Sequence, residues 1–140
     1  MARKDTVARL REVTLFASCS QRELQKVARV TDEITVPAST VLMEEGDSGR
    51  EAYVVLEGTA VVRRNRRKIA EVGPGDCVGE MSLLDRRPRT ATVVADTDLR
   101  VLVLTARALT GLLDESPAFA RKVLASLAAR VRDLDRRIFD

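Results

Sequence analysis

The sequence predicts an α+β protein dominated by β-structure, with a barrel or double-sheet roll between helices at both ends. Apolar residues near both ends recur at helical spacings of three or four. Between residues 34 and 104, short β-branched runs alternate with turn residues instead. Six of the seven glycines fall between Gly46 and Gly79, where these runs meet. A chain of 140 residues suits one domain, with N-terminal helices over 1–31, a roll over 32–104 and C-terminal helices over 105–140.

The N-terminal part predicts two short amphipathic helices. Residues 6–13 place Val7, Leu10 and Val13 on one helical face. Ser20 is followed three residues later by a glutamate, which is the pattern of a capping box. We therefore expect a second helix to begin at Ser20 and to run to about Val30.

The middle of the chain predicts short strands separated by tight turns. The Gly73-Pro74-Gly75 turn combines a proline, which fixes φ, with glycines that can adopt positive φ. The order of the strands within a sheet does not follow from their spacing. The predicted strand runs are residues 34–36, 52–56, 59–62, 90–95 and 99–104.

The C-terminal part predicts a helix capped by Thr105 and a longer helix that begins at Ser116-Pro117. The longer helix carries one apolar stripe with near-heptad spacing. This stripe has two interpretations: it packs on the β-structure of its own chain, or it forms a seam with a second helix. Its members are Phe119, Val123, Leu127, Val131, Leu134 and Ile138.

Composition excludes several classes of function. Histidine is absent, which removes the commonest general base and metal ligand and argues against a histidine-ligated metal site. Cys19 and Cys77 are too few for a metal cluster, so we expect two buried or half-buried thiols. We find no apolar run of roughly 18 residues, no signal peptide, and no nucleophile–base pair or Walker loop. We therefore expect a cytoplasmic protein that is not an enzyme, with no catalytic residue, no metal and no membrane contact.

The charges are nearly balanced, with 24 basic and 21 acidic residues, but the cations cluster once. Five of the six residues between Arg63 and Lys68 are basic and surround Asn65, in a segment that predicts a hairpin tip. The cluster is either a solvated turn or a patch for a partner or an anionic surface. It contains no aromatic residue on which bases could stack, so we expect no nucleic-acid binding.

Residues 75–93 carry the strongest sign of a ligand site. Gly79-Glu80 opens a helical turn, whose first N–H groups suit a phosphate. Arg89 follows Pro88, and its guanidinium fork matches phosphate oxygens. A carboxylate such as Glu80 fits the same pocket if it accepts hydrogen bonds from a ribose hydroxyl. The segment therefore predicts a site that reads both parts of a nucleotide.

This segment resembles the phosphate-binding cassette of cyclic nucleotide-binding domains, found in catabolite-activator-type regulators, protein kinase A regulatory subunits and cyclic-nucleotide-gated channels. The family pattern of Gly-Glu, small or apolar residues, a loop and Pro-Arg is met from residue 79 to residue 93. The resemblance implies an eight-stranded jelly-roll-like β-roll. It implies that Glu80 binds the ribose 2′-hydroxyl, that Arg89 binds the cyclic phosphate and that Thr90 adds a hydroxyl. The remaining expected ligand contacts are Gly79, Met81, Ser82 and Ala91.

The resemblance also implies the ligand, which is cAMP or cGMP, with cAMP favoured. In the family, the terminal helix covers the base, and catabolite-activator-like proteins place Thr-Ser there against adenine. Leu134 and Asp135 stand at those places in this chain, a departure that leaves the adenine contact unsupported. The possible base contacts of this helix are Leu134, Asp135 and Ile138, of which Leu134 or Ile138 could pack on the purine.

We therefore expect a stand-alone, bacterial-type cyclic nucleotide sensor whose C-terminal helix shifts on ligand binding. The chain ends at Asp140, which leaves no room for a helix-turn-helix, so we expect no operator binding. The output would pass to a protein partner in trans, or through a homodimer formed by the C-terminal helix. The alternative is a structural or dimerisation module that has the same fold and no ligand.

Overall fold

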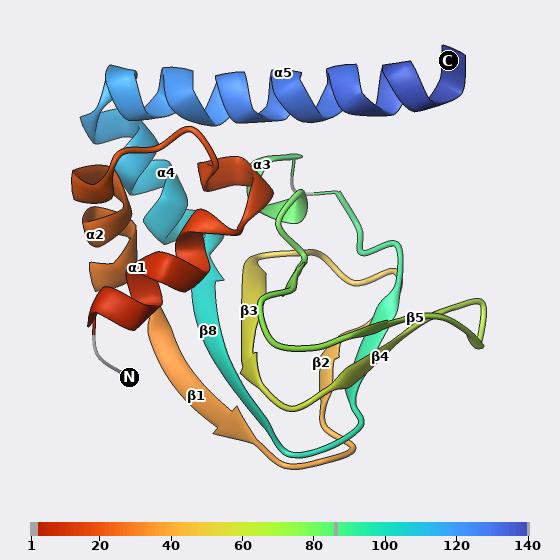
Figure 1. The fold of residues 1–140 in the computed structure, drawn as a ribbon. Helices are drawn as coiled ribbons and strands as arrows, with labels where there is room; N and C mark the ends of the chain where they lie inside the picture. The colour runs from red at the N-terminus through yellow and green to blue at the C-terminus, as the bar shows by residue number, and fades with distance from the viewer. Residues whose placement is uncertain (1–2, 86, 140) are drawn as a thin grey trace. The chain divides into compact units, whose positions relative to one another are not determined.

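The structure is a computed structural model that describes residues 3–85 and 87–139, with side chains described over 5–85 and 87–136. It contains eight strands in two four-stranded antiparallel sheets, together with helices before and after them (Figure 1). The predicted α+β class, the β-roll and the C-terminal helix are therefore confirmed. The chain divides into two compact units, residues 30–109 and residues 1–29 with 110–140, and each is described by itself.

The unit formed by residues 30–109 is the β-roll. Its core is built from both sheets and includes Val55, Val93 and Val101, each at most 1% exposed. The first sheet has the order β1 (Asp32–Val36), β8 (Leu99–Thr105), β3 (Glu51–Glu57) and β6 (Cys77–Val78). The second sheet has the order β2 (Val41–Met43), β7 (Thr92–Ala95), β4 (Ala60–Arg64) and β5 (Arg67–Val72).

Each of the five predicted strand runs overlaps a strand, and two further strands, β2 and β6, were not predicted. β2 has only three residues and β6 only two, which is too short for an alternating pattern to appear. The predicted hairpin around Asn65 is present, with β5 as its second arm, exposed along most of its length. The predicted turn at Gly73-Pro74-Gly75 is present, with Gly75 at φ +93°.

The other unit contains α1 (Arg3–Arg11), a 3₁₀ turn η1 (Thr14–Phe16), α2 (Gln21–Arg29), most of α4 (Ala106–Glu115) and α5 (Pro117–Phe139). The first helix begins and ends earlier than the predicted 6–13. Val13 is extended, with φ −73° and ψ 131°, and it leads into η1 while its side chain stays buried. None of the helices within the described ranges is long and apolar enough to cross a bilayer.

The predicted helix caps are confirmed. Ser20 and Glu23 form a reciprocal capping box: the Ser20 N–H donates to Glu23 Oε1 at 2.8 Å and the Glu23 N–H donates to Ser20 Oγ at 3.2 Å. The Thr105 hydroxyl accepts the Ala108 N–H at 3.1 Å at the start of α4.

The apolar stripe of α5 is buried at its beginning and exposed further along. Phe119 stacks on Phe16 with ring centroids 6.2 Å apart, and Val123 is also buried. Val131 is 64% exposed and Leu134 is 47% exposed. The second half of the stripe therefore has apolar surface left over.

Candidate functional site

The predicted cassette folds as a turn, a two-residue strand, a glycine and a short helix. β6 ends at Val78, and Gly79 follows in the left-handed region at φ +82°. This conformation turns the chain into α3 (Ser82–Asp85), where the Leu83 N–H donates to the Glu80 carbonyl at 3.3 Å. The first N–H groups of such a turn have no partner within the helix, so they are available to an anion.

Arg89 is the central side chain of the site, and it is buried at 7% exposure. Its guanidinium donates to two backbone carbonyls, that of Glu51 and, at 3.4 Å, that of Gly79. Among the described residues, no carboxylate lies within ion-pair distance of this guanidinium. Burial lowers the pKa of Arg89, and the charges of Tyr53 and Glu51 partly offset this effect. A buried cation held only by neutral carbonyls favours an anionic partner.

A loop that precedes β3 fixes the backbone on both sides of Arg89. The Arg89 N–H donates to the Asp47 carbonyl at 2.7 Å, and the Arg89 carbonyl accepts the Gly46 N–H at 2.9 Å. Ser48 and Pro88 form an isolated antiparallel bridge beside them. The loop of residues 46–49 therefore pairs with the cassette loop through backbone hydrogen bonds, in the way that neighbouring antiparallel strands pair.

Two glycines make room for the guanidinium. A Cβ on Gly49 would lie 2.7 Å from Ser82 Oγ and 2.9 Å from Arg89 Cζ. A Cβ on Gly79 would lie 2.9 Å from the Glu51 carbonyl oxygen and closer still to Arg89 Nη1. The structure thus brings Gly79, Ser82 and Arg89 together around Gly49, in a space that any larger residue would fill.

Glu80 lies next to this cluster and is half-buried, with its Oε2 atom shielded from solvent. Burial raises the pKa of the Cys77 thiol, and the negative charge of the Glu80 carboxylate raises it further. A carboxylate in this setting can accept hydrogen bonds from hydroxyl groups, as a ribose contact requires.

The other predicted cassette residues differ in exposure. Thr90 is exposed, Ala91 is buried at 7% and Met81 is 49% exposed. The Thr90 carbonyl accepts a hydrogen bond from Arg64 Nε at 3.0 Å. The tip of the β4–β5 hairpin is therefore tied directly to the residue that follows Arg89.

The predicted base contacts lie on α5, in the helical unit. Leu134 lines a groove of about 370 Å³ whose other lining residues come from the same unit, and Asp135 is exposed. The side chain of Ile138 lies outside the described residues. The contact of Leu134, Asp135 and Ile138 with a base therefore stays a prediction.

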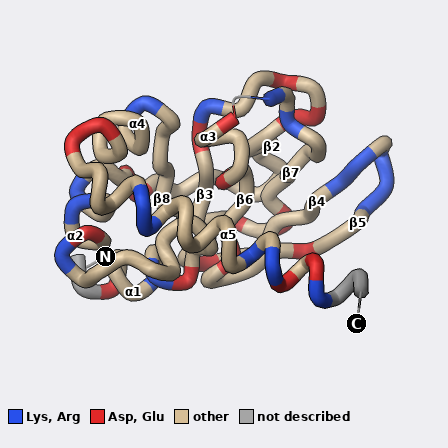
Figure 2. Tube along the Cα trace, turned by 90° about the horizontal axis from the view of Figure 1, so that it is seen from above, with Lys and Arg blue, Asp and Glu red and all other residues tan. Residues whose placement is uncertain are grey.

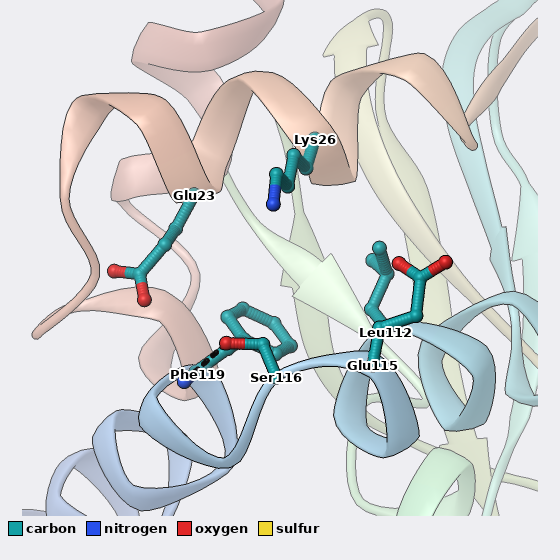
Figure 3. A pocket seen from close by; sticks show the side chains of 6 residues that line it. All are labelled: Glu23, Lys26, Leu112, Glu115, Ser116 and Phe119. Atoms are coloured by element: carbon teal, nitrogen blue, oxygen red, sulfur yellow. Dashed lines mark hydrogen bonds between the residues drawn. The ribbon is translucent and has the colours of Figure 1, made fainter.

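A second cavity in the helical unit is too small for a nucleotide. Figure 3 shows side chains of α2 and of the α4–α5 junction around it, with the Phe119 N–H donating to Ser116 Oγ at 3.2 Å. Its volume is about 20 Å³, which is room for about one water molecule. The hydrogen bond confirms Ser116 as the predicted cap of α5.

Sequence reasoning missed the parts of the site that come from the first half of the chain. Asp47, Gly49 and Glu51 precede Arg89 by about 40 residues, and only the fold brings them to it. The one signal was the pair of glycines in Gly46-Asp47-Ser48-Gly49. One of them turns the chain at φ +92° and the other makes room for the arginine.

The fold and the cassette agree with those of a known family of domains. The family described as the cyclic nucleotide-binding domain matches residues 33–116, which contain nearly all of the roll, the cassette and α4. The chain therefore belongs to the cyclic nucleotide-binding domain family, a class of regulatory domains that are not themselves catalytic.

The chain is similar to regulators from fungi and bacteria. It is 37% identical over 97 residues to a cAMP-dependent protein kinase regulatory subunit of Aspergillus niger, covering 68% of this chain and 24% of the relative. It is 31% identical over 126 residues to the cyclic AMP receptor protein of Thermus thermophilus, covering 86% and 58%. The chain thus spans between a quarter and three fifths of the length of these two relatives.

A solved structure supports the fold over nearly the whole chain. The N-terminal domain of a transcriptional regulator from Streptomyces coelicolor superimposes with a TM-score of 0.84 at 33% identity. The match covers 91% of this chain and 95% of that domain. A likeness of this extent includes elements of both units, and not the cassette alone.

Proposed function

We propose that this chain is a cyclic nucleotide sensor that acts in the cytoplasm and catalyses no reaction. Arg89 binds the cyclic phosphate and Glu80 binds the ribose 2′-hydroxyl. Backbone N–H groups of Gly79, Met81 and Ser82 add further donors. The observation that carries the proposal is the buried Arg89 guanidinium, which has only carbonyl partners among the described residues. The residues present fit a phosphate better than a structural ion pair.

Within this proposal the preferred ligand is cAMP. The relatives described above are named for cAMP dependence and for cyclic AMP. Thr90 is exposed and follows Arg89 in the chain; its hydroxyl would add a contact to the phosphate and is compatible with both nucleotides. Apolar packing of Leu134 or Ile138 against the purine, with Asp135 nearby, would complete the site from α5.

The signal would leave through α5. Ligand binding orders the cassette and shifts the population of α5 positions, because the ligand interacts differently with the two states. The apolar surface at Val131 and Leu134 gives the helix a face for a protein partner or a second copy of this chain. The bound state would then be signalled by a changed contact between this face of α5 and its partner.

Hydrogen exchange with and without cAMP tests the sensor. We expect slower amide exchange over residues 75–93 and altered exchange over Pro117–Phe139 when cAMP is bound. Arg89→Ala should abolish both effects at the same cAMP concentration. Protection of the cassette with unchanged α5 exchange would overturn the helix shift. No protection anywhere in a folded sample would favour a ligand-free structural or dimerisation module.

A further inference from the structure

The tip of the β4–β5 hairpin concentrates positive charge on exposed side chains. β4 ends at Arg64, β5 begins at Arg67, and Asn65 and Arg66 form the turn between them. All residues from Arg63 to Lys68 are exposed, and five of these six are basic. Figure 2 shows both arms of this hairpin in blue toward its tip.

The register of the hairpin places like charges directly opposite one another. Arg63 pairs with Lys68, and Arg64 pairs with Arg67. Like charges at opposing positions of an antiparallel pair destabilise it. The fold gains nothing from two such pairs in succession.

The turn itself also departs from what stability favours. Asn65 and Arg66 have φ values of +52° and +66°, so the turn is of type I′. The second position of this turn favours glycine, since a side chain there is strained in the left-handed region. Arg66 thus adds a charge at a position where glycine would be more stable.

Few of these cations are used inside the protein. Lys68 pairs with Glu71 at 3.3 Å, and Arg64 donates to the Thr90 carbonyl. For Arg63, Arg66 and Arg67, the described residues provide no ion-pair partner. Three exposed guanidinium groups at one tip therefore have no ion-pair partner among the described residues, and charge retained against stability is typical of a functional site.

We propose that the hairpin tip, residues 63–68, is a docking surface for an acidic segment of a partner protein. Its charge is complementary to Asp and Glu side chains, which arginine binds in a bidentate manner. Ile69 is 50% exposed next to the cations and offers one apolar contact. Arg64 links this surface to the nucleotide site through the Thr90 carbonyl, whereas the proposal rests on Arg63, Arg66 and Arg67 and does not require a bound nucleotide.

The dimensions and surroundings of the tip favour a peptide over a larger polyanion. Glu45 lies at the tip, where its Oε1 accepts the Asn65 N–H at 3.0 Å, and Glu71 lies beside Lys68. These carboxylates limit the positive surface to a few residues, which is enough for a short acidic segment but not for a long chain of phosphates. Residues 60–72 include no aromatic side chain that could stack on bases. A membrane would favour several apolar or aromatic anchors, whereas Ile69 is alone among the exposed large apolar residues of this hairpin.

The test measures binding of a fluorescein-labelled octapeptide that contains six glutamates, at 150 mM NaCl, by fluorescence anisotropy. A triple variant, Arg63→Gln/Arg66→Gly/Arg67→Gln, removes the three unpaired charges. The matched control, Arg22→Gln/Arg107→Gln/Arg121→Gln, removes the same net charge from exposed helical positions. We expect the triple variant to weaken peptide binding at least tenfold and the control to change it less than twofold.

Arg66→Gly separates a docking role from a structural one. Glycine relieves the left-handed strain, so we expect this variant to melt at a higher temperature than the wild type while binding the peptide more weakly. A 20-base-pair DNA duplex and vesicles with 30% phosphatidylserine serve as competing probes. The proposal is overturned if the wild type does not bind the peptide, or if the control variant weakens binding as much as the triple variant. It is also overturned if DNA or vesicles bind the tip more tightly than the peptide does.

Discussion

A methyl group at position 49 should displace the guanidinium that we assign to the phosphate. In Gly49→Ala, the new Cβ would lie 2.9 Å from Arg89 Cζ and 2.7 Å from Ser82 Oγ. Carbon atoms in contact lie about 3.5–4.0 Å apart, so Arg89 must move by about 0.6–1 Å. Losing one charge-assisted hydrogen bond costs about 1.5–3 kcal/mol, so we expect cyclic nucleotide affinity to fall ~10- to 100-fold. Overpacking should also lower the free energy of unfolding by about 1–3 kcal/mol.

Isothermal titration with cAMP and urea unfolding measure these two effects. The matched control is Gly111→Ala, since a Cβ there meets no atom within 4 Å. We expect that control to leave affinity unchanged and to stabilise α4 by about 0.5–1 kcal/mol. Equal affinity and equal stability for Gly49→Ala and the wild type would refute the close packing of residues 46–49 against Arg89.

Three further changes test other parts of the structure. Ser116→Ala removes the cap of α5 and should lower the free energy of unfolding by about 1 kcal/mol in urea, whereas Ser116→Asp should not. Arg64→Ala removes the hydrogen bond to the Thr90 carbonyl and should weaken cAMP binding about threefold to tenfold by titration, with Arg63→Ala as an unaffected control. Burial raises the pKa of Cys19 from 9.0 to about 11, so the unfolded thiol ionises before the folded one. The free energy of unfolding should therefore fall as pH rises from 9 toward 11, and Cys19→Ala should reduce that slope in urea unfolding.

Local chemistry made most of the helices predictable from sequence. Each helix cap is a hydrogen bond to a residue three positions further along the chain, so the sequence alone predicts it. The caps at Ser20, Thr105 and Ser116 are confirmed. The cassette was found for the same reason, because Gly79 and Arg89 lie within one short segment. Their roles toward a nucleotide stay predictions.

What the sequence did not predict depends on contacts between distant segments. β2 and β6 exist because they pair with β7 and β3, and not because of their own pattern. Gly49 and Glu51 meet Arg89 only in the folded roll, since about 40 residues separate them in the chain. The like-charge pairs of the basic hairpin require the register, which spacing alone does not fix.

The claim that Arg89 binds a cyclic phosphate is tested most directly by calorimetric titration. Nucleotide-stripped wild type is titrated with cAMP and then with cGMP, beside Arg89→Ala and the exposed control Arg87→Ala. We predict saturable binding that is tighter for cAMP, ~10- to 100-fold weaker in Arg89→Ala and unchanged in Arg87→Ala. The absence of heat with either nucleotide from a folded sample, or unchanged affinity in Arg89→Ala, would contradict the account.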